Sequence, residues 1–126
     1  MRRLFVDCDD TLIIYDNPDS PEGSHAYGYL QGYPWHPNEK LVSYIKWFAA
    51  EYQRALIVIW SGGGGDYART IANKVLPMLE VATMIKDETT YDLVRPNDIV
   101  FDDCDLPIVA EVLRPDALDK YSKIDI

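Results

Sequence analysis

Cysteine, histidine and basic side chains are scarce in this chain. It contains two cysteines and two histidines, without the spacing typical of a zinc site. Cys8 and Cys104 are expected to be free thiols, as is usual in the cytosol. The 12 lysines and arginines are outnumbered by 21 acids, which gives a net charge of −9. These shortages argue against structural zinc and against passive binding to nucleic acid, which needs a basic surface.

A long apolar run is also missing. No stretch approaches the roughly 20 residues that span a membrane, so no membrane contact is expected. Asp7 interrupts the first apolar run too early for a signal peptide, which predicts a cytoplasmic location. The hydrophobic fraction of 48% is typical of a globular protein, and the length suits one domain, 1–126.

Acids are concentrated directly after apolar runs. One such run leads into Asp7 and Asp9, and another, near the other end of the chain, leads into Asp102 and Asp103. Alternate residues of a strand point to the same side, so Asp7 and Asp9 are expected to converge. Because burying unpaired carboxylates is costly, a cation is expected between them, and Mg²⁺ prefers oxygen ligands. The sequence predicts one shared magnesium site.

Apolar patterns predict the main elements of the fold. Four apolar runs are predicted strands: Arg3–Asp7, 55–60, 81–85 and Ile99–Phe101. Apolar residues between 41 and 52 recur at three- and four-residue steps, which predicts a helix capped by Asn38 or His36. Further helices are predicted over 66–76, capped by Asp66, and over 107–113. The tail from 116 to 126 fits a helix, an edge strand or a loop.

The alternation of strands and helices defines the fold class. It predicts an α/β, three-layer, Rossmann-like parallel sheet with helices on both faces. Prolines and glycines between 16 and 37 exclude a helix there, and Tyr27, Tyr29 and Tyr33 alternate with other residues. We therefore expect a short flap over about 12–36 and no large cap. Its aromatic residues suit either a platform for stacking a base or the attachment of the flap to the body.

Four polar residues each follow a different predicted strand. They are Asp7, Ser61, Lys86 and Asp102. Ligands of open parallel sheets bind at the carboxyl ends of the strands, so these side chains are expected in one crevice. The mixture suits a phosphoryl group: Mg²⁺ neutralises its oxygens, Lys86 adds a positive charge, and Ser61 and the amides from Gly62 onward donate hydrogen bonds. One carboxylate would attack phosphorus, and another would transfer protons.

The order of these residues resembles the four motifs of the haloacid dehalogenase (HAD) superfamily. The resemblance covers residues 4 to about 105. The matching positions are Asp7-x-Asp9-x-Thr11-Leu12, then Ser61, then Lys86, then Asp102-Asp103. Lys74 and Arg95 compete with Lys86 for the third motif, but Lys74 falls within a predicted helix and Arg95 precedes a proline.

The resemblance implies a role for each matching residue. Asp7 would be the nucleophile and a metal ligand, and Asp9 the general acid/base, with its backbone carbonyl on Mg²⁺. Thr11 would order the first loop. Ser61 would hold a phosphoryl oxygen, and Lys86 would stabilise the nucleophile and the phosphate. Asp102, Asp103 or both would complete the metal site, with Asp103 favoured as the direct ligand.

The expected activity is that of a capless Mg²⁺-dependent phosphatase acting through an aspartyl-phosphate. Its substrate would be a nucleotide, a nucleic-acid end, a phosphoprotein or a small metabolite. An open site of this type implies a large substrate or a lid from a partner subunit, so a homo-oligomer is one expectation. The acidic pair and the helix predicted after it are weakly similar to the phosphatase half of phage polynucleotide kinases. Alternatives are a non-catalytic regulatory module, a phosphotransferase and a dehalogenase.

Overall fold

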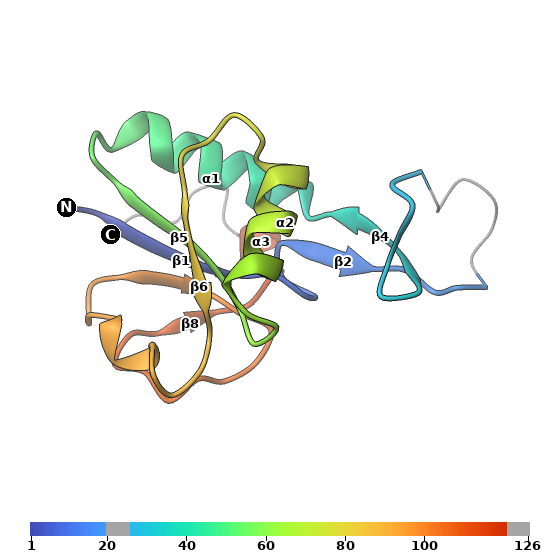
Figure 1. Ribbon diagram of the computed structural model, residues 1–126. Helices are drawn as coiled ribbons and strands as arrows, with labels where there is room; N and C mark the ends of the chain where they lie inside the picture. Colours follow the sequence, from blue (N-terminus) through green and yellow to red (C-terminus); the bar gives the residue numbers. More distant parts are fainter. Residues whose placement is uncertain (20–25, 121–126) are drawn as a thin grey trace.

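A five-stranded parallel sheet forms the centre of the molecule. The computed structural model of the chain describes residues 1–19 and 26–120. The order of the strands is β6-β5-β1-β7-β8. Figure 1 shows the sheet together with helices α1 and α2. Their bounds are Arg3–Asp7 (β1), Leu56–Ser61 (β5), Ala82–Ile85 (β6), Ile99–Phe101 (β7) and Val112–Leu113 (β8). The predicted α/β class with a parallel sheet is confirmed, and so are the four predicted strands.

The last strand, β8, lies where a helix was predicted over 107–113, and that prediction was wrong. Leu106, Ile108 and Ala110 pack against the sheet, whereas Pro107 and Val109 between them are exposed. This two-residue alternation is that of an extended chain, because successive side chains of an extended backbone point to opposite sides. The segment leads into β8, which pairs in parallel with β7.

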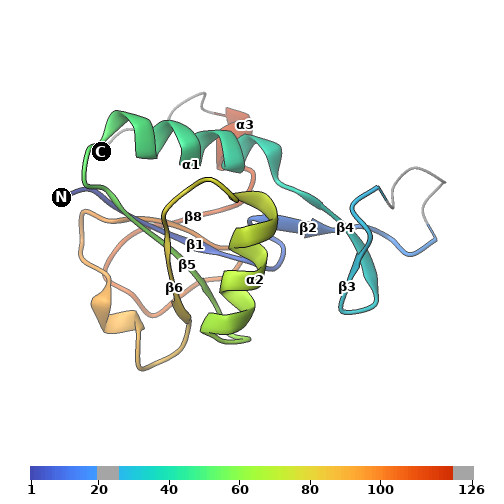
Figure 2. The same cartoon turned by 45° about the horizontal axis from the view of Figure 1, so that its top comes forward.

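The α-helices of the described residues lie on one face of the sheet. They are α1 (Glu39–Glu51), α2 (Gly65–Val75) and α3 (Ala117–Lys120), and each contributes apolar side chains to the larger core cluster. Figure 2 shows α1 and α3 beside each other on this side. The opposite face is covered by a 3₁₀ turn, η1 (Tyr91–Leu93), and by the extended segment before β8, with Trp60 against Tyr91. Helices were predicted on both faces of the sheet. In the described part of the chain, α-helices cover one face only.

The N-terminal caps determine where helices α1 and α2 begin. Asn38 caps α1 by accepting a hydrogen bond from the Leu41 amide, and its side-chain nitrogen donates to the Thr11 carbonyl at 3.0 Å. One cap residue therefore also fixes the loop that follows β1. The cap of α2 is Gly64, not the predicted Asp66, because the backbone there has φ 107°, which residues with a Cβ rarely adopt.

A small antiparallel sheet, β2-β4-β3, lies where the flap was predicted. Its strands are Ile13–Tyr15 (β2), Tyr29–Leu30 (β3) and Tyr33–Pro37 (β4). β3 and β4 form a hairpin, and Gln31 and Gly32 both have positive φ in its turn, as a type I′ turn requires. Residues 20–25 of the predicted flap, and residues 121–126 of the tail, lie outside the described residues. No helix in the described part is long and apolar enough to cross a membrane.

Candidate functional site

The site lies at the carboxyl edge of the parallel sheet. The chain passes from β1 to β5 and β6 on one side, and then to β7 and β8 on the other side of β1. Such a reversal of strand order opens a crevice beyond the strand ends, between β1 and β7. Asp7 ends β1 and Asp102 directly follows β7, and the two residues are 4% and 0% exposed.

Lys86 joins these two acids. Its Nζ donates hydrogen bonds to Asp7 Oδ1 and to Asp102 Oδ2, each at 2.8 Å. Lys86 follows β6, and its backbone amide donates to the Ser61 carbonyl at 2.8 Å, which fixes it beside the end of β5. The structure thus brings together residues from four strand ends. Of the three cations considered for the third motif, Lys86 is the one that contacts Asp7.

The second oxygen of each buried carboxylate also has a partner. Thr11 Oγ1 donates to Asp7 Oδ2 at 3.0 Å, and the Cys104 amide donates to Asp102 Oδ1 at 2.9 Å. Thr11 is itself fully buried. All four oxygens of the two acids are therefore held, which fixes both carboxylates in one orientation. Such supporting hydrogen bonds are typical of groups that must keep a set geometry for ligand binding.

Charge in this cluster is not balanced, because two carboxylates share one ammonium. Burial raises the pKa of Asp7 to about 7, the bonds from Lys86 oppose this rise, and Asp102 adds to it. Burial also raises the pKa of Asp102. Burial lowers the pKa of Lys86, but the hydrogen bonds to both carboxylates outweigh it and the net shift is upward. The cluster therefore favours an additional positive charge.

Ser61 and the glycines after it form the neighbouring wall. Ser61 ends β5 and is 2% exposed, and its Oγ accepts a hydrogen bond from the Gly63 amide at 3.0 Å. A hydroxyl that accepts in this way keeps its own proton for another acceptor. A Cβ on Gly62 would lie 3.9 Å from the Lys86 carbonyl, so Gly62 passes close to the lysine backbone. Ser61, Gly62 and Lys86 are therefore adjacent, as predicted.

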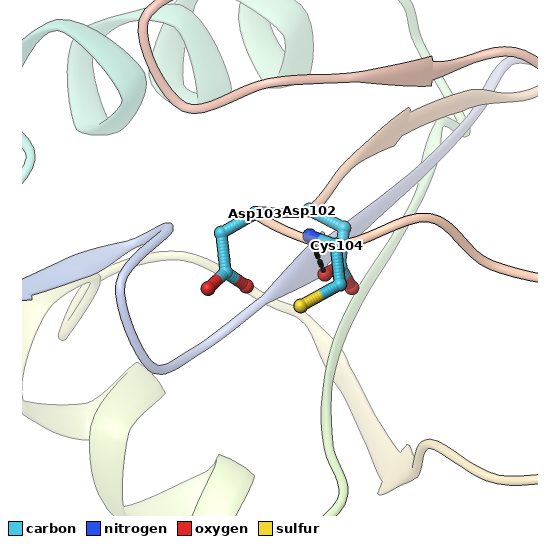
Figure 3. Close-up of side chains that lie close together, drawn as sticks. All are labelled: Asp102, Asp103 and Cys104. Carbon is cyan, nitrogen blue, oxygen red and sulfur yellow. Dashed lines mark hydrogen bonds between the residues drawn. The ribbon is translucent and has the colours of Figure 1, made fainter.

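Asp103 lies at the open side of the site. The ligand atoms of Asp102, Asp103 and Cys104 lie within 4.8 Å of one another, and Asp103 is exposed (Figure 3). The negative charge of Asp103 raises the pKa of Cys104, which keeps it a thiol. Carboxylate oxygens suit a hard cation such as Mg²⁺, whereas a protonated thiol does not. Of these three side chains, the two acids are the candidates for holding a hard cation.

Asp9 is held separately, by two residues that the sequence analysis did not predict. Tyr15 and Tyr67 each donate a hydroxyl hydrogen bond to Asp9 Oδ1, at 2.7 and 2.6 Å. Burial, followed by the bond to Asp9, raises the pKa of Tyr67 to about 12, and burial also raises that of Tyr15. Both phenols are therefore donors at neutral pH. Their contact with Asp9 depends on how β2 and α2 pack, so no local sequence signal identifies it.

Comparison of the chain with protein-family models, curated proteins and solved structures found no match. The functional inference therefore rests on the residues of the site and on their geometry. Two features bear on it most: the lysine shared by two buried acids, and the carboxylate held by two phenols.

Proposed function

We propose that the chain is a Mg²⁺-dependent phosphatase that hydrolyses a phosphomonoester through an aspartyl-phosphate on Asp7. The observation that carries this proposal is the position of Lys86 Nζ, 2.8 Å from both Asp7 and Asp102. A purely structural ion pair needs one acid for each base, because an unpaired buried charge is costly. A second buried acid at the carboxyl edge of the sheet suits a site that takes up a divalent cation and a phosphate.

The oxygen groups of the site would bind the metal. Asp7 and Asp102 would hold Mg²⁺ together with Asp103 and the backbone carbonyl of Asp9, in line with the resemblance to the HAD superfamily. When bound, the ion neutralises phosphoryl oxygens and so lets an anionic substrate approach anionic side chains. The Lys86 ammonium and the Ser61 hydroxyl would bind the remaining phosphoryl oxygens.

The reaction proceeds in two transfers of the phosphoryl group. In the first, an oxygen of Asp7 attacks phosphorus, the bond from phosphorus to the leaving-group oxygen breaks, and that oxygen takes a proton from Asp9. In the second, Asp9 removes a proton from water as the water attacks phosphorus. Inorganic phosphate leaves and the Asp7 carboxylate is restored. Thr11, bonded to Asp7 Oδ2, keeps the nucleophile oriented.

The test of this proposal is a phosphatase panel run with and without Mg²⁺. It contains nucleotides, 3′- and 5′-phosphorylated oligonucleotides, sugar phosphates, phosphopeptides and an aryl phosphate. Asp7→Asn is expected to lower kcat on the order of 10⁴-fold, because it removes the nucleophile. Asp10→Asn is the matched control: Asp10 is exposed with φ 58°, a conformation that Asn tolerates, and its variant is expected to stay active.

Other outcomes would identify other functions. A chain that binds Mg²⁺ and phosphate but turns over no ester would be a regulatory module, and the proposal would fail. Transfer of phosphate to an added alcohol would identify a phosphotransferase that uses the same intermediate. A preference for oligonucleotide ends or phosphopeptides over small esters would support the capless, open site.

A further inference from the structure

Two tyrosine hydroxyls converge on one oxygen of Asp9. Tyr15 and Tyr67 both donate to Oδ1, and their own oxygens are 3.1 Å apart. The reaction as described above uses neither ring. On the basis of the proposed function, we propose that Tyr15 and Tyr67 are positioning residues that hold the Asp9 carboxyl for proton transfer at the leaving-group oxygen.

The direction of the hydrogen bonds assigns a task to each oxygen of Asp9. A carboxylate oxygen that accepts two donors is a poor place for a further proton, because its lone pairs are already engaged. Oδ1 is therefore the anchor, and Oδ2 is the oxygen that would carry a transferred proton. Two donors from different elements also fix the plane of the carboxyl, which one donor would leave free to turn.

Tyr67 also lies between Asp9 and the turn that follows Ser61, which would bind the phosphate. Its ring packs against Gly63, where a Cβ would lie 3.3 Å from the ring and 3.4 Å from Ser61 Oγ. Ser61 would bind an oxygen of the phosphoryl group, while Asp9 would serve the leaving oxygen on the same phosphorus. The Tyr67 side chain contacts both Asp9 and the turn after Ser61, so a shift of this ring would change their separation. A misplacement of about 1 Å in such a site costs roughly 100-fold in rate.

Tyr15 links the same carboxyl to the flap. It ends β2, and its ring meets that of Tyr33 in β4 edge-on, with 6.2 Å between centroids. The flap thus packs against one ring of the pair of phenols. Movement of the hairpin would therefore alter the orientation of Asp9.

The experiment compares two substrates that differ in their need for a general acid. An aryl phosphate with a good leaving group departs with little help from a proton, whereas an alkyl phosphate such as glycerol 2-phosphate needs one. Tyr67→Phe is expected to lower kcat/KM, which reports the first transfer, about 100-fold on the alkyl ester and by less than about threefold on the aryl ester. Tyr15→Phe should show the same asymmetry. Hydrolysis of the aspartyl-phosphate is common to both esters, so kcat alone does not separate them.

The matched control is Tyr52→Phe, which removes another half-buried phenol. Tyr52 lies at the end of α1, where its ring contacts Arg2, and its variant should leave both activities unchanged. Asp9→Asn measures the full difference in activity loss between the two esters. The double variant with Tyr67→Phe should lose little further activity, since the two residues act together.

The results distinguish a positioning role of the two phenols from a purely structural role. Equal loss of kcat/KM on the two esters in Tyr67→Phe, or losses that add to those of Asp9→Asn, would make the phenols structural and overturn this inference alone. A wild-type chain inactive on every ester of the phosphatase panel would overturn the proposed function together with the role of the pair.

Discussion

The same two strands carry an ion pair at one end and the candidate site at the other. At their amino ends, Arg3 begins β1 and Asp98 precedes β7, and Arg3 Nε lies 3.2 Å from Asp98 Oδ2. At their carboxyl ends, Asp7 and Asp102 share Lys86. The lysine and arginine side chains are similarly buried, at 14% and 12% exposed.

The difference lies in the charge balance. The amino-end pair has one cation and one anion, and Asp98 gains a further bond from the Arg95 amide at 2.7 Å. The carboxyl-end cluster has two anions and one cation. A fold that needed only a clamp between β1 and β7 would be served by the balanced pair. On the proposed function, the surplus acid serves to bind a ligand.

Removing the cation at either end of the strand pair should give the largest change in the free energy of unfolding. Lys86→Met and Arg3→Met should each lower the free energy of unfolding by about 3–5 kcal/mol, because each leaves buried acid without its partner. Mg²⁺ should restore much of the loss in Lys86→Met and none in Arg3→Met, since only the first leaves a pair of carboxylates to bind it. Urea unfolding with and without Mg²⁺ measures both. Equal responses to Mg²⁺ would contradict the comparison.

The second-largest effect is expected in the pH dependence of the stability of the metal-free chain. Burial raises the pKa of Asp7 from 3.8 to about 7, so the folded state binds its proton more tightly than the unfolded state. The contribution of this group to stability is full below pH 3.8 and is lost as the pH rises from there to about 7, a loss of about 4 kcal/mol.

The check is chemical denaturation of the metal-free chain between pH 4 and 8, compared with Asp7→Asn. The variant lacks the titrating group, so the difference between the two curves should widen with pH. Mg²⁺ should stabilise the wild type more at pH 8 than at pH 5, because the cation binds the ionised acid. A difference that does not change with pH would refute the assignment to Asp7.

The smallest effect is expected at the exposed edge of the site. Asp103→Asn should weaken Mg²⁺ binding about tenfold, which is the lower end of the range for residues that support a metal site. Asp105→Asn is the control, because Asp105 is exposed and pairs with Arg114. Its affinity should stay within about twofold of wild type by calorimetric titration. Equal losses in both variants would indicate only a general effect of negative charge.

Much of the site's backbone could be predicted from the sequence. Apolar runs place Asp7, Ser61, Lys86 and Asp102 at strand ends, and a parallel sheet gathers such ends whatever the side chains between them. This inference needs only local patterns and one rule of topology. The meeting of Lys86 with two acids agrees with it.

The remaining features depend on tertiary contacts that no local pattern encodes. The segment after Asp105 has helix-compatible residues, but it lies against the sheet face beside Trp60, and packing there favours an extended chain that ends in β8. The cap of α2 depends on a backbone dihedral that only Gly64 adopts easily. The phenols on Asp9 come from elements 52 residues apart in the chain.

The central position of β1 ties function to the completion of folding. β1 is synthesised before both of its hydrogen-bonded neighbours, whose pairing with it begins at Leu56 and at Ile99. Until residues 99–102 have been synthesised, the sheet lacks β7 and the cluster of Asp7, Lys86 and Asp102 lacks one of its acids. On the proposed function, a chain that ends before this point would therefore have no activity.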